Sequence, residues 1–269
     1  MTDNVVNELI DSLRNKAKRY ASLWQLIRHQ DQIPDLAVRI WNAPDVTSIL
    51  LAELCEHYGI VQNLNMTLQA SRMLCNVINM IKCLAMHPDT RVSCLKANLP
   101  FYLQPFMLIQ SNQALYEKPC GASLNVLGAL MMAHDSFATE YALKMDLVPI
   151  CLKYMETGSI SLKTTATYIL LTCLENTEGC YYVCHQIELA SAAIFTLGNI
   201  VRSIREHPAL PIVRLVIRCY IQLSTDEGIR MIIRLNLPEE LKDAHSKFFF
   251  GSYQRVKSCI RELHVKVYS

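Results

Sequence analysis

Glycine is scarce in this chain of 269 residues, which holds only 8 glycines and 10 prolines. A glycine share of about 3% lies well below the usual share of about 7%. The shortage disfavours sites built on glycine-rich phosphate loops, and it disfavours all-β folds, which use glycine in their turns. The apolar residues are mainly Leu, Ile, Met, Ala and Cys, a set that favours helices over strands.

Charge is also limited, because charged residues make up 19% of the chain and the net charge is only +2. Hydrophobic residues make up 51%, which predicts a large core and argues against disorder. Residues 200–269 carry 12 Lys or Arg and 7 Asp or Glu, a local net charge of +5. A solvated helix surface is the simpler interpretation of this basic quarter, and an acidic or nucleic-acid partner is the alternative.

The 11 cysteines show no spacing typical of a disulfide framework, and their number is odd. We therefore expect free thiols in a reducing compartment. The first 19 residues lack the apolar stretch of a secretory signal. The longest uncharged stretch, 97–116, contains prolines and amides and is unsuited to a membrane span. The expectation is a soluble cytoplasmic or nuclear protein with no membrane partner.

Apolar residues recur at helical spacing throughout, and no segment alternates apolar and polar residues as a strand would. Segments beginning at His87, His134 and Asp226 share one pattern: a polar turn, a short amphipathic helix, a proline and a new helix. Their prolines, at positions 100, 149 and 238, are 49 and 89 residues apart, or one and about two periods.

A helical unit that repeats every 40 to 50 residues is typical of armadillo and HEAT solenoids. The chain length then predicts an all-α, armadillo-type α-solenoid of about six helical repeats. No linker divides the sequence, so we expect a single domain over residues 1–269. The inner helices are predicted around 68–85, 123–132, 162–174 and 212–223.

No catalytic pattern accompanies the repeats. The sequence has no P-loop and no G-x-S-x-G motif, and its acidic residues are scattered. Cys180, Cys184 and His185 form one ligand-like cluster, but no second pair of ligands follows at a suitable distance, so buried structural thiols are the favoured interpretation. We predict no enzyme, no metal and no cofactor.

A solenoid without catalytic residues indicates a scaffold whose inner helices bind peptides. Asn76, Asn125 and Thr165 are spaced by 49 and 40 residues, and we expect them at equivalent positions in successive inner helices. Lys118 and Tyr168 lie near the same predicted groove. The alternative is that these asparagines only satisfy carbonyl groups of neighbouring repeats. The segment KFFFGSYQRVK (247–257) is interpreted as packing of the last helix, with a protein or nucleic-acid contact as alternatives.

Eight segments together resemble the armadillo subunit of the CCR–NOT deadenylase complex, the family named "required for cell differentiation". In order they are IPDLA (33–37), HPDTR (87–91), LPFYLQPF (99–106), SLNVLGAL (123–130), VPICLKYMETGS (148–159), KTTATYIL (163–170), VIRCYIQLS (216–224) and LPEELKD (237–243). The resemblance covers residues 33–243. It implies six armadillo repeats without catalytic activity, docked onto the NOT scaffold subunit.

The resemblance also implies sites that recruit regulators of mRNA decay and translation: a groove for short helical peptides and pockets for tryptophan. In animal members a Tyr and an Arg help shape a tryptophan pocket, but their positions here hold Ile187 and Leu189. An Arg early in the last repeat is replaced by Gly228. We therefore expect degenerate tryptophan pockets and a groove more polar than that of the family, whose Tyr, Gly and Val correspond to Lys118, Asn125 and Thr165.

The leading hypothesis is thus a non-catalytic adaptor of the deadenylase complex, which acts in mRNA deadenylation and translational repression. The alternatives are an unrelated armadillo or HEAT adaptor, such as a transport or assembly factor, and a nucleic-acid-binding solenoid that uses the basic quarter.

Overall fold

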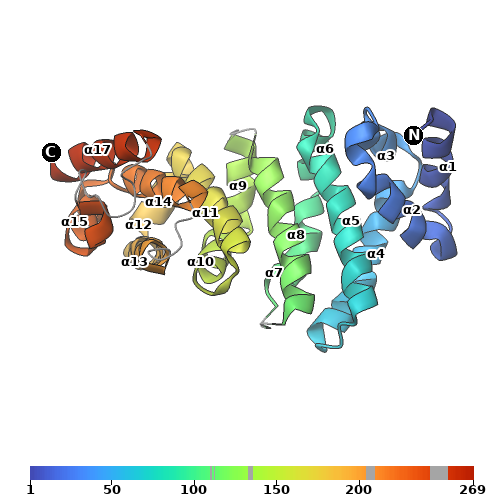
Figure 1. The fold of residues 1–269 in the computed structure, drawn as a ribbon, viewed down its shortest axis with the longest axis horizontal. Helices are drawn as coiled ribbons and strands as arrows, with labels where there is room; N and C mark the ends of the chain where they lie inside the picture. The colour runs from blue at the N-terminus through green and yellow to red at the C-terminus, as the bar shows by residue number, and fades with distance from the viewer. Residues whose placement is uncertain (110, 112, 133–135, 204–209, 243–253) are drawn as a thin grey trace. The chain divides into compact units, whose positions relative to one another are not determined.

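The computed structural model describes residues 1–269 except 110, 112, 133–135, 204–209 and 243–253. Every regular element in the described part of the chain is a helix (Figure 1). The predicted all-α class is confirmed. Among these residues, none of the helices combines the length and the apolar character needed to cross a membrane.

The contacts group the chain into two compact units, residues 1–133 (the N-terminal unit) and residues 134–269 (the C-terminal unit). The single domain over residues 1–269 stays a prediction. The segment 247–257 and the turn at His134 fall wholly or largely outside the described residues.

The N-terminal unit holds eight α-helices and two short 3-10 helices among its described residues. They are α1 (Asp3–Ser12), α2 (Lys16–Arg28), η1 (Gln30–Gln32), α3 (Leu36–Asn42), α4 (Val46–Gln62), α5 (Leu68–Met86), α6 (Pro88–Lys96), η2 (Leu99–Leu103), α7 (Gln104–Met107) and α8 (Ala114–Met131). The long helices α2, α5 and α8 pack in succession, α2 on α5 and α5 on α8.

The described part of the C-terminal unit repeats this arrangement. Its helices are α9 (Ser136–Lys144), α10 (Leu147–Thr157), α11 (Ile160–Glu175), α12 (Thr177–His185), α13 (Ile187–Ser203), α14 (Leu210–Leu223), α15 (Glu227–Asn236), α16 (Glu239–Lys242) and α17 (Gln254–Tyr268). Here α11 packs on α14 and α14 on α17. The four predicted inner helices correspond to α5, α8, α11 and α14.

The prolines that mark the repeat lie where a helix tolerates them. Pro149 is in the first turn of α10, Pro100 is the second residue of η2, and Pro238 directly precedes α16. Proline is favourable there because the first turn of a helix has no partner for its N–H groups.

Four turns that precede helices contain a residue other than glycine in the left-handed backbone conformation. The residue before the helix has a positive φ in each: Asp35 (53°), Asp45 (64°), Asn98 (54°) and Asp146 (52°). Aspartate and asparagine enter this left-handed region more easily than other residues with a Cβ atom. The chain therefore forms these tight turns despite its low glycine content, because aspartate and asparagine occupy the positions with positive φ.

The sequence-based start of the second inner helix, at residue 123, was wrong by nine residues, because α8 begins at Ala114 and continues through Pro119. Proline cannot donate to the carbonyl of Leu115, four residues earlier. The hydroxyl of Ser71 on α5 donates to that carbonyl at 2.8 Å. A side chain from the neighbouring repeat thus satisfies the acceptor that the proline leaves open.

Candidate functional site

The structure places three of the predicted groove residues on two packed helices of the N-terminal unit. Asn76 is half-buried on α5, and Lys118 and Asn125 are exposed on α8. The backbone N–H of Met66 donates to the Tyr116 hydroxyl at 3.0 Å, which together with the Ser71 contact holds the start of α8 in place. Burial raises the pKa of Cys75 on α5 to about 11, and the nearby Lys118 ammonium acts in the opposite direction.

We call Asn76, Lys118 and Asn125 the amide–lysine surface. It offers one cation beside two amides, a combination that can bind a peptide backbone and an acidic side chain. Its role in binding stays a prediction.

The other two predicted groove residues belong to the C-terminal unit. Thr165 and Tyr168 are both half-buried on α11, which packs against α14. Three threonines on the same helix turn their hydroxyls back onto carbonyls one turn earlier: Thr164, Thr167 and Thr172. The hydroxyls of these half-buried and buried threonines are therefore satisfied by carbonyl groups of their own helix.

The three positions of the predicted degenerate pockets lie on two helices that pack together, α13 and α15. Ile187 is the first residue of α13 and is 61% exposed, whereas Leu189 is half-buried. Gly228 is exposed near the start of α15, where an added Cβ would come within 3.4 Å of Asp226 Oδ1. That these positions form degenerate tryptophan pockets stays a prediction.

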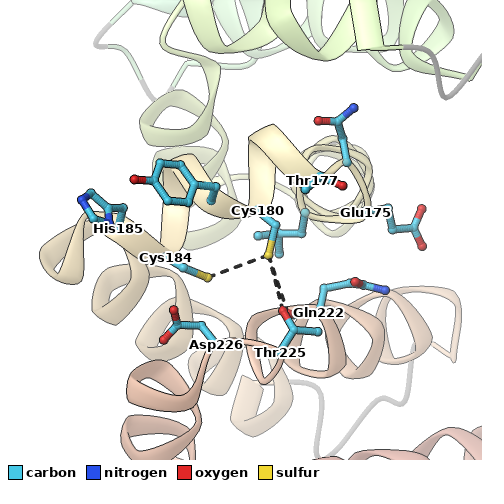
Figure 2. Close-up of a pocket in the computed structure, with 11 residues that line it drawn as sticks. Glu175, Thr177, Cys180, Cys184, His185, Gln222, Thr225 and Asp226 are labelled. Atoms are coloured by element: carbon cyan, nitrogen blue, oxygen red, sulfur yellow. Dashed lines mark hydrogen bonds between the residues drawn. The ribbon is translucent and has the colours of Figure 1, made fainter.

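Cys180 and Cys184 lie at a surface pocket of about 400 Å³ in the C-terminal unit. Figure 2 shows their sulfurs facing each other beside the turn that joins α14 to α15. The two Sγ atoms are 3.9 Å apart. Cys180 Sγ also lies 3.8 Å from the carbonyl oxygen of Gln222 and 3.7 Å from Thr225 Oγ1. We call Cys180, Cys184 and Thr225 the thiol cluster.

Local sequence explains how α12 presents these thiols. The Asn176 side chain accepts from the backbone N–H groups of Glu178 and Gly179 at 3.0 and 3.2 Å and so begins the helix. Spacing of four residues then brings both cysteines to one face. Gly179 allows α12 to approach the end of α11, since an added Cβ would overlap the carbonyl oxygen of Cys173.

The two thiols affect each other's ionisation. Hydrogen bonding from Cys184, aided by Thr225, lowers the pKa of Cys180 to about 6, against the opposing effects of burial and of Asp226. Sharing its proton with Cys180, together with burial, raises the pKa of Cys184. The arrangement therefore favours the thiolate at Cys180 and keeps the proton on Cys184.

His185 does not complete a metal site with the two cysteines. Its ring stacks on Tyr181 with centroids 4.8 Å apart, and Figure 2 shows it turned away from the sulfurs. Within the described ranges, no three His, Cys, Asp or Glu side chains are grouped as metal ligands. Sequence reasoning found the cysteines but missed Gln222 and Thr225, because no local pattern shows which turn packs against α12.

A second pocket, of about 680 Å³, lies in the N-terminal unit and is mainly apolar and aromatic. Its lining includes Tyr58, Phe101 and Pro105. The Tyr58 hydroxyl donates to the carbonyl oxygen of Tyr102 at 2.8 Å. The Tyr58 ring lies beside the Phe106 ring, with the two ring centroids 5.5 Å apart. Phe101 is 61% exposed at this surface.

The helical repeats match solved armadillo structures over nearly the whole chain. One is a designed armadillo repeat protein in complex with the peptide (KR)4, with a TM-score of 0.69, 9% identity, and coverage of 97% of this chain and 99% of that chain. Another designed armadillo repeat protein gives a TM-score of 0.68 at 10% identity, with the same coverage of each chain. At such low identity the likeness concerns the fold alone, and it confirms an armadillo-type repeat protein.

Sequence comparison then identifies the family. The model of the "Cell differentiation family, Rcd1-like" matches residues 9–267, and the chain belongs to this family. It is 31% identical over 263 residues to "Cell differentiation protein rcd1" of Schizosaccharomyces pombe, which covers 98% of this chain and 93% of the relative. It is also 31% identical over 248 residues to "Protein CAF40" of Saccharomyces cerevisiae, covering 90% of this chain and 65% of that relative. The predicted family is confirmed, and the match extends beyond residues 33–243 at both ends.

Proposed function

We propose that this protein is a non-catalytic adaptor subunit of the CCR–NOT mRNA deadenylation complex. The observation that carries the proposal is the family match over residues 9–267, supported by relatives named rcd1 and CAF40 that align along 98% and 90% of the chain. In this role the protein works by binding: it docks on the NOT scaffold subunit and presents other surfaces to regulators. Such a role places it in the cytoplasm or the nucleus.

The absence of an enzymatic role is part of the same proposal. An armadillo-type fold offers long packed helices whose exposed side chains receive peptides, and binding is the usual activity of such repeats. The thiol cluster lacks the base and the orienting group of a nucleophilic catalyst, since His185 is stacked on Tyr181.

For the recruitment of regulators we assign the amide–lysine surface to a short amphipathic helix that carries an acidic residue. Lys118 is exposed and supplies the positive charge, while Asn76 and Asn125 supply amides able to hydrogen bond with the peptide. Thr165 and Tyr168 are proposed to contact a peptide in the C-terminal unit. A single exposed lysine contributes more to the rate and the specificity of association than to its free energy.

Docking is tested by a pull-down of the full chain against the central region of the NOT scaffold of the same organism. Stable co-elution is expected. No binding at micromolar concentrations would contradict the proposal and leave an armadillo adaptor with another partner.

Recruitment needs a separate test. Lys118→Glu is compared with Lys96→Glu, a matched reversal at an exposed lysine on α6 of the same unit. Peptides of regulators captured by the wild-type protein should be lost with Lys118→Glu and kept with Lys96→Glu. Equal capture by both variants would remove the amide–lysine surface from the proposal, whatever the outcome of the scaffold pull-down.

A further inference from the structure

We propose that the thiol cluster is a site of reversible oxidation, in which a hydroperoxide reacts at Cys180 and Cys184 converts the product to a disulfide. The proposal rests on three observations: two sulfurs 3.9 Å apart, their place at an open pocket, and a hydroxyl beside the sulfur that reacts first. It does not depend on the function proposed above.

The reacting sulfur is accessible without unfolding. Cys180 and Cys184 are both half-buried, and both line the pocket of about 400 Å³. A water molecule takes up about 30 Å³, so a small hydroperoxide fits readily. Figure 2 shows the Cys180 sulfur between the Cys184 sulfur and Thr225, with the pocket residues around it.

The environment of the pair prepares one sulfur for attack and keeps a proton on the other. Thr225 Oγ1 lies 2.7 Å from the Gln222 carbonyl oxygen and 3.7 Å from Cys180 Sγ, so its single proton is donated to that carbonyl when Cys180 is a thiol and can turn to the sulfur when the thiolate forms. A pKa of about 6 makes Cys180 mainly a thiolate at neutral pH, and the thiolate is the nucleophilic form. Asp226 opposes this effect, and its carboxylate accepts the backbone N–H of Ile229 at 2.9 Å.

Two other half-buried thiols, Cys75 and Cys83, contrast with this pair. Burial raises the pKa of Cys75 to about 11, and burial also raises the pKa of Cys83. Both are therefore protonated at neutral pH. These two cysteines provide internal controls, since they are half-buried like Cys180 but have a raised pKa.

The proposed oxidation of Cys180 and Cys184 takes place in two steps. The Cys180 thiolate attacks the distal oxygen of the hydroperoxide, a sulfur–oxygen bond forms, the O–O bond breaks, and the alcohol or water leaves after taking a proton from solvent. Cys184 then attacks the Cys180 sulfur, a disulfide forms, and hydroxide leaves with the Cys184 proton as water. The two thiols together lose two electrons and the hydroperoxide gains them.

Closing the disulfide requires a local change in α12. Cβ atoms four residues apart in a helix are separated by about 5–6 Å, whereas a disulfide needs about 3.5–4.5 Å. Cys184 lies in the last turn of α12, which ends at His185 and is followed by Gln186 in an extended conformation. This turn can unwind without disturbing a longer helix, and doing so would move His185 from its stack on Tyr181.

The test exposes the native, reduced, full-length protein to hydrogen peroxide at neutral pH and then blocks remaining thiols. Cleavage after glutamate releases residues 179–188, which contain Cys180 and Cys184 and no other cysteine. The expected product is this peptide with two hydrogens fewer, restored by dithiothreitol. Its formation should be at least tenfold faster than oxidation of Cys75 or Cys83.

Two variants separate the roles of the thiols. With Cys184→Ser, a sulfenic acid should accumulate at Cys180 and be trapped by dimedone. With Cys180→Ser, oxidation of Cys184 should slow at least tenfold, whereas the control Cys75→Ser should leave formation of the disulfide unchanged.

The wild-type measurement alone can overturn the proposal, so it does not depend on how the variants fold. A peptide 179–188 that stays reduced while Cys75 and Cys83 are oxidised would refute it. So would direct oxidation of Cys180 to sulfinic acid without any disulfide.

Discussion

Both units contain an arginine–glutamate pair between helices, but the two pairs differ greatly in burial. In the N-terminal unit Arg19 on α2 meets Glu53 on α4, and their side chains are only 10% and 5% exposed. In the C-terminal unit Arg218 on α14 meets Glu175 on α11, with 45% and 19% exposed. Arg19 also donates from Nε to the carbonyl oxygen of Leu13 at 2.7 Å. The same pair of residue types is thus a buried polar connection in one unit and a surface contact in the other.

The comparison shows that one repeat fold can be held together in different ways. A buried charge depends on its partner, because without it the remaining charge has neither water nor a counter-ion. In an exposed pair, a charged group that loses its partner is solvated by water, so the loss costs little free energy. The C-terminal unit lacks such a buried pair among its described residues and instead brings helices close through small residues such as Gly179.

The largest expected effect comes from Glu53→Gln, which should lower the free energy of unfolding by about 3–5 kcal/mol because Arg19 stays charged and buried. Glu175→Gln, the matched change in the C-terminal unit, should cost below about 1 kcal/mol. Urea unfolding followed by circular dichroism measures both. Equal losses would contradict the comparison, and replacing both buried partners, as in Arg19→Met with Glu53→Leu, should recover most of the loss.

The next largest effect concerns glycine. Gly179→Ala should destabilise the C-terminal unit by about 1–3 kcal/mol, because the new methyl group would overlap the Cys173 carbonyl and come within 3.1 Å of Thr139 Cγ2. Gly59→Ala on α4 has nothing within 4 Å and should stabilise the N-terminal unit by about 0.5–1 kcal/mol. In thermal unfolding, the melting temperatures of the two variants should shift in opposite directions. Shifts of the same sign would be evidence against this account.

Thiols in the two units should also differ in how their reactivity depends on pH. The rate at which iodoacetamide labels Cys180 should be half-maximal near pH 6 and should decrease further at lower pH. The pKa of Cys180 is lowered, so its thiolate is lost only as the pH falls through this range. Labelling of Cys75 should still be rising near pH 11. At pH 7.5 we expect Cys180 to react about tenfold faster, because its larger thiolate fraction outweighs its weaker intrinsic nucleophilicity. Mass spectrometry of each peptide gives both profiles, and parallel profiles would disprove the assignment.

The smallest expected difference concerns helix caps. Asn176 accepts two backbone N–H groups at the start of α12, whereas Thr67 accepts only that of Ala70, at 3.1 Å, at the start of α5. Asn176→Ala should cost about 1 kcal/mol and Thr67→Ala about 0.5 kcal/mol of unfolding free energy. Chemical denaturation resolves the two values if they differ as expected, and a larger loss for Thr67→Ala would reverse the ranking.

Much of the fold could be predicted from local patterns. Prolines 100, 149 and 238 showed the repeat correctly, because proline is favourable in the first turn of a helix and costly inside one. The same rule misplaced the start of α8, where Ser71 from α5 satisfies the carbonyl opposite Pro119. A local rule fails there because the compensating group comes from a different repeat.

The candidate sites divide in the same way. Asn76, Asn125 and Thr165 lie on α5, α8 and α11, within the helices predicted there, and their place in a common groove stays a prediction. The sequence also showed that Cys180 and Cys184 share one face of a helix. It could not show that Gln222 and Thr225 approach them, since that contact joins residues more than 40 positions apart.

The sequence by itself therefore determined the helices, their repeat and the family, because helical periodicity and turn chemistry act between residues a few positions apart. Only the tertiary structure decided which buried groups meet: Arg19 with Glu53, Ser71 with the Leu115 carbonyl, and Cys180 with the α14–α15 turn. Those contacts depend on how helices from different repeats pack side by side, and no pattern within one repeat records that.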